Sequence, residues 1–481
     1  RRRIMQNSHV VELRGAYFPY TCRSAHGSHI YCAQIFKPPT LVLRGYLLST
    51  LTLLPQESSM AAPVKYDVVL YGATGFTGSM AAQYLAAHPQ QPRVAFAGRN
   101  EKKIRGVIEK LTDVSKERVE SIGVIVASAE DLNSIKAMVA QTKAVINMVG
   151  PYALYGGFEL AKAAAEAGTS YVDLTGESSV YKRIKNELHD IAKQTHADIV
   201  PSSGFDSLPF DLTTYLAVQA LHKSSGGKAD VDYALCGYEF KGSLSGGTVA
   251  SLVEQAKVSP ITSSDAYDLA PIRGRQKAEA VRLRKLPQFN KYGAFTLLAP
   301  HNTGVTNRSW GLLQEAQDPA SYGADFRYLE GQVAPGMISA YIISSLMLFI
   351  AWLLNNVSYA GDLLRKAVPQ GTGASMEEQL KGFCNVRTLA YGKDGKSKAM
   401  ATLSVKGDPG YLRTAMFISE TALTLSLEKA RLSKLGQQGG VLTPATAGGE
   451  VLAERLRKYG GVKIETKDVS NSTDLSKELQ A

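Results

Sequence analysis

Short apolar runs and amphipathic stretches alternate along the chain from Met60 onward. Six runs have the length and composition of buried strands: Val68–Tyr71, Val94–Ala97, Ile122–Ala127, Ala144–Val149, Tyr171–Leu174 and Ile199–Pro201. Stretches with helical spacing lie between them, and the clearest are Asp131–Ala140, Glu159–Ala167 and Val180–His196. This succession of strand–helix units predicts an α/β fold built on a doubly wound parallel sheet.

The first predicted strand runs into a glycine-rich turn within Tyr66–Gly78, YDVVLYGATGFTG, and a helix-like stretch follows. A strand that turns on glycines into a helix exposes backbone N–H groups at the positive end of that helix, which binds pyrophosphate. The pattern therefore predicts a Rossmann-type dinucleotide-binding domain, with a purely structural turn as the alternative. The residues expected to hold the cofactor here are Gly72, Ala73, Thr74, Gly75, Phe76, Thr77 and Gly78.

The end of the second predicted strand indicates which dinucleotide binds. NAD-binding proteins usually place an Asp or Glu here to accept from the ribose 2′-hydroxyl, but this chain has Arg99, followed by Lys102 and Lys103. A guanidinium group binds a phosphate through paired hydrogen bonds. We therefore expect NADP(H), with Arg99, Asn100 and Lys103 beside the cofactor. Two other interpretations stay open: a solvated helix start, and Asn100 as its N-cap.

Polar, glycine-rich segments follow the next three predicted strands, at Asn147–Tyr152, Asp173–Glu177 and Ser202–Ser207. Ligands of doubly wound sheets bind at the carboxyl ends of the strands, so Asn147 and Gly150 are expected near the cofactor. Tyr152, Glu177 and Asp206 can carry protons and are candidate catalytic residues. Asp206 is equally suited to capping the helix that starts near Leu208, and ordinary turn chemistry explains any one of these residues as well.

A series of motifs extends this pattern along most of the chain. GATGFTG, AGRN, INMVGPYALYG, YVDLTGE and PSSGFDSLPFD are followed by Lys241–Thr248 (KGSLSGGT), Gly407–Tyr411 (GDPGY) and Gly439–Ala445 (GGVLTPA). In this order the motifs resemble the saccharopine dehydrogenase-like oxidoreductases, in the branch that includes the bacterial trans-acting enoyl reductases. The resemblance covers about residues 64–466. It implies a second α/β domain, a C-terminal return to the first domain, and self-association as a homodimer.

These observations divide the chain into five parts. They are a leader that is disordered or a non-native extension (1–59), an NADP-binding Rossmann domain (60–227), a second α/β domain with a mixed sheet (228–438, with an apolar segment at 334–357), a return segment (439–466) and a polar tail (467–481). The second domain is expected to contain strands at Val231–Tyr238, Val386–Tyr391 and Lys398–Val405. A glycine-rich turn at Ser245–Thr248 leads into a helix that either faces the substrate or is structural.

One segment departs from the pattern of a soluble enzyme. No charged residue occurs between Glu330 and Asp362, and Met337–Leu354 is an apolar stretch of 18 residues. This length meets the lower limit for a membrane-spanning helix, and Trp352 near its end suits an interfacial anchor. A buried core helix is the alternative. The resemblance favours membrane contact, because animal members of the family resemble lipid-droplet and membrane-associated proteins; spanning and lying in a monolayer both stay open.

Charge and cysteine content add few constraints. The formal net charge is +11, and residues 1–59 contribute seven basic and two acidic side chains to it. No basic stripe with interleaved aromatic residues occurs, so we expect no nucleic-acid partner. The four cysteines are scattered and form no disulfide framework, and we expect no metal site. We expect a membrane-associated protein on the cytoplasmic face or on lipid droplets; a genuine presequence at 1–59 would instead direct it to an organelle.

Three functions are compatible with these features. The first is an NADP(H)-dependent oxidoreductase that reduces an enoyl or carbonyl group of a lipid-like substrate at a membrane or lipid droplet. The second is a dinucleotide-binding membrane or lipid-droplet scaffold without turnover. The third is a soluble saccharopine reductase of amino-acid metabolism, which the apolar segment disfavours.

Overall fold

The computed structural model describes residues 64–227, 229–243, 246–258, 265–277, 283–357, 359–369 and 373–479. The leader expected at 1–59 and Ser245 of the predicted glycine-rich turn lie outside the described residues.

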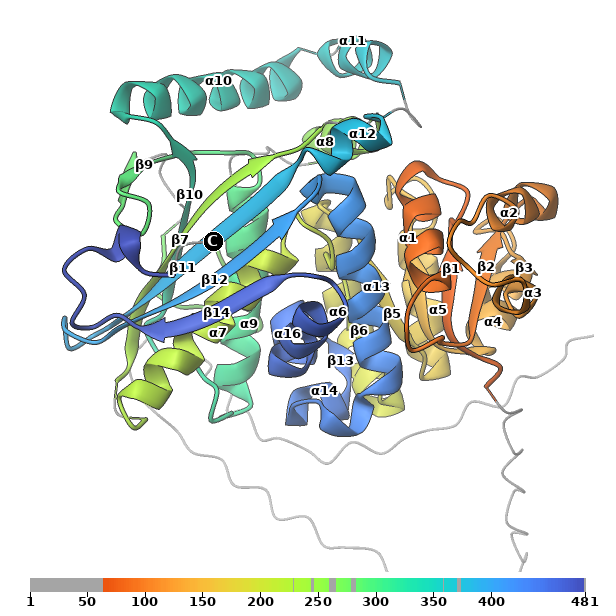
Figure 1. Ribbon diagram of the computed structural model, residues 1–481, viewed down its shortest axis with the longest axis horizontal. Helices are drawn as coiled ribbons and strands as arrows, with labels where there is room; N and C mark the ends of the chain where they lie inside the picture. The colour runs from red at the N-terminus through yellow and green to blue at the C-terminus, as the bar shows by residue number, and fades with distance from the viewer. Residues whose placement is uncertain are drawn as a thin grey trace, which may run out of the picture. The chain divides into compact units, whose positions relative to one another are not determined.

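The first sheet is parallel throughout and has seven strands (Figure 1). In spatial order the strands are β13 (Gly440–Val441), β6 (Asp198–Val200), β5 (Ser170–Asp173), β4 (Thr142–Asn147), β1 (Tyr66–Tyr71), β2 (Val94–Gly98) and β3 (Gly123–Val126). All six strands predicted in this region are present, and the predicted doubly wound sheet is confirmed. Only β13, which is two residues long and comes from the C-terminal part of the chain, was not predicted as a strand.

Helices cover both faces of this sheet because successive side chains of each strand point to opposite sides. In β1, Val68 and Leu70 belong to the hydrophobic cluster that includes α1, whereas Val69 and Tyr71 belong to the cluster that includes α4, α5 and α6. The helices of this part are α1 (Phe76–Ala86), α2 (Glu101–Ile108), α3 (Lys116–Glu120), α4 (Leu132–Val139), α5 (Gly157–Ala167) and α6 (Ser178–Thr195).

The second sheet is mixed, as the family resemblance implied. Its seven strands lie in the order β14 (Lys463–Asp468), β12 (Lys398–Lys406), β11 (Phe383–Gly392), β7 (Val231–Lys241), β10 (Arg327–Ala334), β9 (Lys291–Ala294) and β8 (Arg284–Leu286). β7 and β10 pair in parallel, and the other neighbouring strands pair in antiparallel fashion. Helix α7 (Leu208–Ser224) connects the two sheets along the chain and packs on β11, β12 and β14.

The helices between the strands of the second sheet are α8 (Gly246–Val258), α9 (Ala299–Glu315), α10 (Met337–Asn356), α11 (Ala360–Ala367) and α12 (Met376–Leu380). After β12 follow η1 (Pro409–Arg413), α13 (Thr414–Leu427), η2 (Lys429–Arg431), α14 (Lys434–Gln438), α15 (Pro444–Ala447), α16 (Gly449–Lys458) and η3 (Leu475–Lys477). Helix α13 packs on β1, β4 and β5 of the first sheet and on α1. The C-terminal part of the chain therefore covers one face of the first sheet.

Buried side chains from the two sheets join in a single hydrophobic cluster. Val172 and Val200 of the first sheet and Val231 and Val386 of the second are members of it. The return segment predicted at 439–466 contributes β13 to the first sheet and the start of β14 to the second. The domain limits stay a prediction, because the two sheets share this core.

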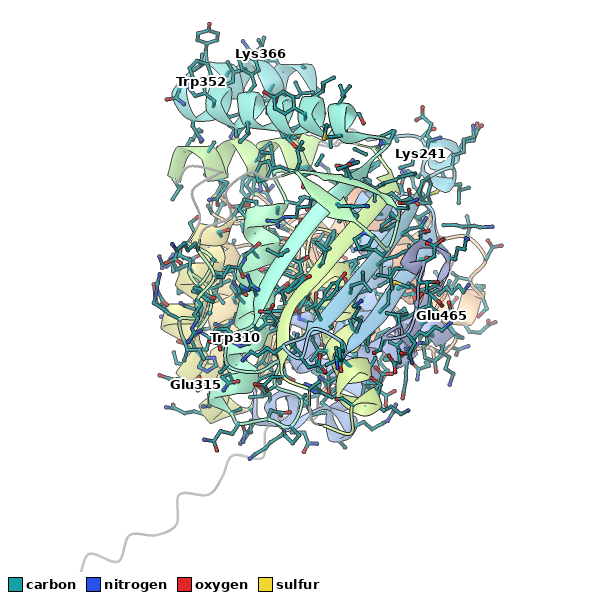
Figure 2. The ribbon with its side chains drawn as sticks, turned by 90° about the vertical axis from the view of Figure 1, so that its left-hand side faces the viewer. Lys241, Trp310, Glu315, Trp352, Lys366 and Glu465 are labelled. Carbon is teal, nitrogen blue, oxygen red and sulfur yellow. The ribbon has the colours of Figure 1, made fainter. Side chains whose placement is uncertain are left out.

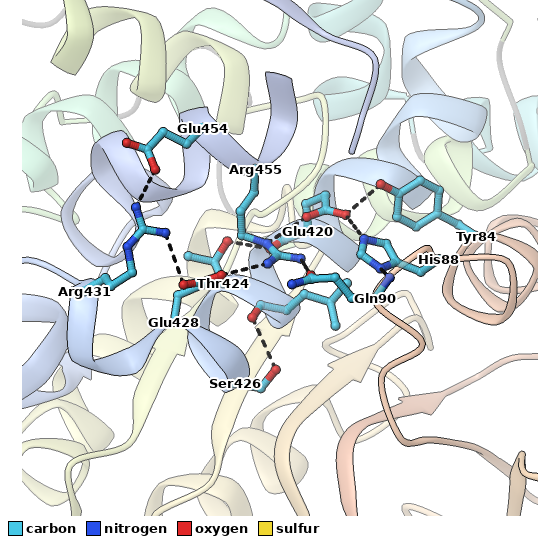
Figure 3. A network of polar contacts seen from close by, with 11 residues as sticks. Tyr84, His88, Gln90, Glu420, Thr424, Ser426, Glu428, Arg431, Glu454 and Arg455 are labelled. Atoms are coloured by element: carbon cyan, nitrogen blue, oxygen red, sulfur yellow. Dashed lines mark hydrogen bonds and ion pairs between the residues drawn. The ribbon is translucent and has the colours of Figure 1, made fainter. Parts of the chain in front are cut away.

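A buried polar network also ties the first sheet to the C-terminal helices (Figure 3). The Glu420 carboxylate of α13 accepts hydrogen bonds from the Tyr84 hydroxyl at 2.7 Å and the Arg455 guanidinium at 2.9 Å, and it contacts the His88 ring at 2.9 Å. Arg455 also bonds Glu428 at 3.1 Å. Because Tyr84 lies on α1, this network holds the helix that begins at the glycine turn.

Candidate active site

A cavity of about 1610 Å³ lies at the carboxyl ends of the strands of the first sheet. Its wall begins with the turn between β1 and α1 and continues with the segments that follow β2 to β6. Residues from α8, β10, α9 and α10 close it on the side of the second sheet, among them Leu252, Gln332, His301 and Met347. One continuous space therefore connects the predicted cofactor turn to the second part of the molecule.

The glycine turn has the geometry that a bound pyrophosphate requires. Gly72 has a φ of +91°, a left-handed conformation that side chains disfavour, and its carbonyl accepts from the Gly75 N–H at 3.1 Å. A Cβ atom on Gly78 would lie 2.1 Å from the Gly72 carbonyl oxygen, so only glycine fits there. Gly75 caps α1 without a side chain, which leaves the first N–H groups of α1 open to a ligand.

Arg99 and Lys103 line the same cavity beyond the end of β2. Both side chains are exposed, and within the described parts of the chain the Arg99 guanidinium forms no ion pair with a carboxylate. Two unpaired cations next to the glycine turn suit the 2′-phosphate of NADP(H). Their contact with the cofactor stays a prediction.

Three of the predicted cofactor residues do not line the cavity. The Asn100 carboxamide oxygen accepts from the Lys103 N–H at 3.0 Å and caps α2, as the alternative interpretation proposed. Asn147 is buried, donates to the Tyr171 hydroxyl at 3.1 Å and accepts from the Val149 N–H at 3.0 Å. Ala73 is fully buried below the turn. The other predicted cofactor residues, Gly72, Thr74, Gly75, Phe76, Thr77, Gly78, Arg99, Lys103 and Gly150, line the cavity.

Tyr152 and Glu177 hold the loop after β4 in place. The Tyr152 hydroxyl donates to the Asn147 carbonyl at 3.1 Å and accepts from the Leu174 N–H at 2.9 Å, and burial raises its pKa well above the usual value. The Glu177 carboxylate accepts from the N–H groups of Tyr152 and Ala153, both at 2.9 Å. Tyr152 lines the cavity and Glu177 does not. Their bonds are therefore mainly structural.

Asp206 lies on the cavity wall, and it does not cap the following helix. Helix α7 begins at Leu208 with Ser207 at its N-cap position, and no side chain forms the capping hydrogen bond. Burial raises the pKa of Asp206 to about 6. Of the three candidate proton carriers, Tyr152 and Asp206 thus line the cavity, and the Tyr152 hydroxyl is bonded to two backbone groups.

The structure adds three polar residues that sequence reasoning did not single out. Ser178 starts α6, Ser202 follows β6 and His301 comes from α9, and all three line the cavity. Ser202 and Ser178 lie in or next to the polar strand ends noted in the sequence. His301 lies about a hundred residues further along the chain, outside every motif, so only the tertiary structure connects it with them.

Ser202 is held in an unusual backbone conformation. Its φ is +60°, which is uncommon for a residue with a side chain and often marks a functional site. The Asp173 carboxylate accepts from the Ser202 N–H at 3.0 Å and from the Thr175 N–H at 2.8 Å. Burial raises the pKa of Asp173 to about 6, although these two hydrogen bonds act to lower it. Asp173 therefore sets the shape of the loop that presents the Ser202 hydroxyl.

Helix α8 connects the cavity with the apolar helix α10. Leu252 and Gln255 of α8 line the cavity, while α8 also packs against α10 and α11. The Glu254 carboxylate on α8 pairs with Arg365 of α11. Half-buried Met347 of α10 reaches the cavity wall. The far end of the cavity thus lies directly beneath α10.

Helix α10 is apolar and largely exposed. Among the described helices it is the one that is long and apolar enough to cross a membrane, with 17% of its most apolar window buried. Ala340, Ser344 and Ala351 form its buried face. Large side chains cover the opposite face: Ile338, Tyr341, Ile342, Leu346, Phe349 and Trp352 are each more than half exposed. Trp352 of α10 and Lys366 of α11 lie on the side of these helices away from the sheets in Figure 2.

Comparison with known proteins agrees with this architecture. The saccharopine dehydrogenase NADP binding domain matches residues 68–200. A protein of Mycobacterium tuberculosis, provisionally named as a trans-acting enoyl reductase, is 34% identical over 84% of this chain and 98% of its own length. The trans-acting enoyl reductase of Mycobacterium leprae is 32% identical over 83% of this chain and 97% of its own length. A saccharopine dehydrogenase (L-Glu forming) from Saccharomyces cerevisiae shares the fold, with a TM-score of 0.51, 13% identity and coverage of 84% of this chain and 100% of that one.

The fold, the glycine turn and the matching domain define an NADP-dependent oxidoreductase. More particularly, the chain belongs to the saccharopine dehydrogenase-like family, alongside the trans-acting enoyl reductases. The sequence-based prediction of NADP(H) as cofactor is confirmed at the level of the domain. When bound, this cofactor would supply a hydride from its dihydronicotinamide ring. The assignment of individual cofactor residues stays a prediction.

Proposed function

We propose that this protein reduces an enoyl or carbonyl group of a lipid-like substrate with NADPH at a membrane or lipid-droplet surface. The observation that carries the proposal is the continuity of one cavity from the glycine turn to Met347 of α10. A hydride donor held at the turn and an apolar chain entering beneath α10 would meet at the strand ends of β4 to β6. The names of the bacterial relatives favour an enoyl substrate.

The exposed face of α10 supports the membrane part of the proposal. Contiguous apolar surface on a helix, with a Trp residue and a Lys on the helix that follows, suits the boundary between lipid headgroups and acyl chains. The buried face of α10 packs on β9, β10 and α8, so the helix would lie in the plane of the surface rather than cross it. A substrate could then pass from the lipid layer to the cavity along α8 and Met347.

Two measurements test the proposal together. The full chain is mixed with NADPH and a medium-chain trans-enoyl thioester or the matching ketoacyl thioester, and NADPH absorbance is followed with and without phospholipid vesicles. We expect NADPH consumption that vesicles increase. Binding of NADPH without its consumption with either probe would favour the scaffold function. Formation of NADPH from NADP⁺ with saccharopine alone would favour the third function.

A matched pair of variants tests the cofactor assignment. Arg99→Ala is expected to weaken NADPH binding about tenfold or more and to leave NADH binding almost unchanged, because the lost charge-assisted bonds contact the 2′-phosphate alone. Lys110→Ala, at an exposed position beyond the end of α2, is the control. Fluorescence titration with each dinucleotide measures the effect. Equal losses for NADPH and NADH would contradict the role of Arg99.

A further inference from the structure

Three side chains from distant parts of the chain form a continuous hydrogen-bonded row on the cavity wall. The Ser178 oxygen lies 2.9 Å from Nδ1 of His301, and the Ser202 oxygen lies 3.0 Å from Nε2 of the same ring. The imidazole therefore bridges two hydroxyl groups, and all three residues line the ligand space. No family motif and no comparison assigns this row a role.

The direction of the hydrogen bonds follows from one neighbouring carbonyl. The Ser202 hydroxyl lies 2.5 Å from the Thr175 carbonyl oxygen, which can only accept, so the hydroxyl donates there. Nε2 of His301 must then donate to the Ser202 oxygen, which makes Nδ1 the acceptor of the Ser178 hydroxyl. Burial lowers the pKa of His301 to about 4, so the ring is neutral near neutral pH. A neutral imidazole can release a proton from one nitrogen while it accepts one at the other.

We propose that Ser202, His301 and Ser178 form a proton relay for the reduction, with the Ser202 hydroxyl as the group that protonates the substrate. The relay rests on the reductase function proposed above. Bound NADPH would supply a hydride to the electron-poor carbon of the substrate, and the π electrons of its double bond would move to the far atom as an enolate or alkoxide. The Ser202 O–H would turn from the Thr175 carbonyl to that anion and give it the proton, leaving NADP⁺ and the reduced product.

The remaining steps return a proton to Ser202 and reverse the tautomer of the ring. Ser202 regains a proton from Nε2 of His301 while Nδ1 takes the proton of Ser178, and both transfers pass between atoms that are already hydrogen-bonded, so no charge is left on the buried ring. Ser178 then regains a proton from water in the cavity. Proton exchange with water returns the ring from the Nδ1–H to the Nε2–H tautomer before the next turnover. His301 and Ser178 act through Ser202 and are positioning residues.

The other candidate proton carriers are less well suited to this step. Burial raises the pKa of the Asp206 carboxyl to about 6, but within the described residues no side chain is hydrogen-bonded to it that could return a lost proton. The Tyr152 hydroxyl is bonded to two backbone groups, and within the described residues no titratable side chain donates to it to restore a lost proton. Ser202 has His301 directly behind it for that purpose.

A substrate-free measurement tests the protonation state that the relay requires. The full chain is produced with isotope-labelled histidine, and nitrogen NMR distinguishes the charged ring and its two neutral tautomers; His301→Gln assigns the signal. We expect a neutral ring protonated on Nε2 near neutral pH. A charged ring, or one protonated on Nδ1, would overturn the relay whether or not the protein consumes NADPH.

Kinetic measurements with the medium-chain trans-enoyl thioester test the proton transfer itself. Ser202→Ala is expected to lower kcat about 10²-fold or more and to leave KM nearly unchanged, as for the loss of a general acid. Ser202→Gly tolerates the left-handed backbone and separates a folding defect from this effect. Ser203→Ala is the matched control, because the Ser203 hydroxyl bonds only the Val200 carbonyl outside the cavity and wild-type rates are expected.

The solvent isotope effect distinguishes a relay from a structural role. When kcat of the wild type is plotted against the fraction of heavy water in the solvent, it should fall along a curve because more than one proton moves. The same plot should become linear in His301→Gln and Ser178→Ala. If Ser202→Ala keeps the wild-type kcat, the relay is wrong and the proposed reduction still stands. If the wild-type chain consumes NADPH with neither the enoyl nor the ketoacyl probe, the proposed reduction itself is wrong.

Discussion

Helices α10 and α13 both consist mainly of apolar residues, but their surroundings are opposite. In α13 every residue from Thr414 to Ser426 is buried, whereas in α10 only Ala340, Ser344 and Ala351 are. Helix α13 lies against β1, β4, β5, α1 and α16, which leaves no face open (Figure 1). Helix α10 contacts β9, β10, α8 and α11 on one face only. An apolar helix is therefore buried where partners surround it, and composition alone does not decide this.

The two helices also differ in whether they carry a buried charged group. The hydroxyls of Ser419, Thr421 and Thr424 in α13 donate to carbonyls one turn earlier, and the Glu420 carboxylate pairs with Arg455. Burial of polar groups is tolerated there because each of these groups has a partner. Helix α10 contains no charged residue, its buried Ser344 hydroxyl likewise donates to a carbonyl one turn earlier, and its outward face is apolar. The comparison makes α13 a structural element and α10 a candidate surface for lipid.

Placing a lysine on each helix gives the largest expected contrast. Leu423→Lys in α13 should destabilise the fold by about 4 kcal/mol or more, because it buries an unpaired charge. Leu346→Lys, at an exposed position of α10, should change stability by about 0.5 kcal/mol or less. Thermal unfolding followed by circular dichroism measures both. Similar losses for the two variants would show that α10 is buried in solution.

Breaking the polar network of α13 should have the next largest effect. Arg455→Met leaves the Glu420 carboxylate without its buried cation and should cost about 3–5 kcal/mol. Arg431→Met is the matched control, since Arg431 pairs with Glu428 and Glu454 at a half-exposed site and should cost about 1 kcal/mol or less (Figure 3). Urea unfolding of the two variants measures the difference. Equal unfolding midpoints for the two variants would show that the network does not stabilise the position of α1.

Removing apolar side chains from the outer face of α10 should act on lipid binding and spare the fold. Ile342→Ser combined with Phe349→Ser should weaken vesicle binding about tenfold or more, since each side chain loses burial in lipid. As a control, Val126→Ser combined with Leu132→Ser removes two exposed apolar side chains from β3 and α4, away from α10 in the sequence. Co-sedimentation with phosphatidylcholine vesicles measures binding. Unchanged binding in the α10 variant would leave this face without a role in membrane contact.

The smallest expected effect concerns the inner face of α10. The Ser344 hydroxyl donates to the Ala340 carbonyl at 2.7 Å and accepts from the Phe295 N–H at 2.9 Å. Ser344→Ala leaves that N–H without its partner and should cost about 1 kcal/mol locally. Hydrogen exchange of the Phe295 amide should quicken, and the exposed neighbour Ser345→Ala should leave it unchanged. An unchanged rate in Ser344→Ala would mean that the contact between α10 and β9 is not maintained in solution.

Particular residues explain how far sequence reasoning could reach. The β1–α1 turn could be predicted because its strand, glycines and helix are consecutive, and the cost of a side chain at Gly78 is local. Arg99 could be placed because it directly follows β2. Asn147 and Glu177 are also next to strand ends, but their side chains bond the loops that they stabilise instead of facing the cavity. Whether a polar side chain points to a ligand or to its own loop depends on the tertiary arrangement.

The sequence by itself determined the parallel sheet, the dinucleotide turn and the family, because each depends on residues that are neighbours along the chain or on a long series of motifs. Only the tertiary structure decided which apolar helix is exposed and that His301 lies between Ser178 and Ser202. The physical reason is the same in both cases. Burial and hydrogen bonding are properties of pairs of groups, and the partners come from different elements: His301 lies 99 residues from Ser202, and Phe295 lies 49 residues from Ser344.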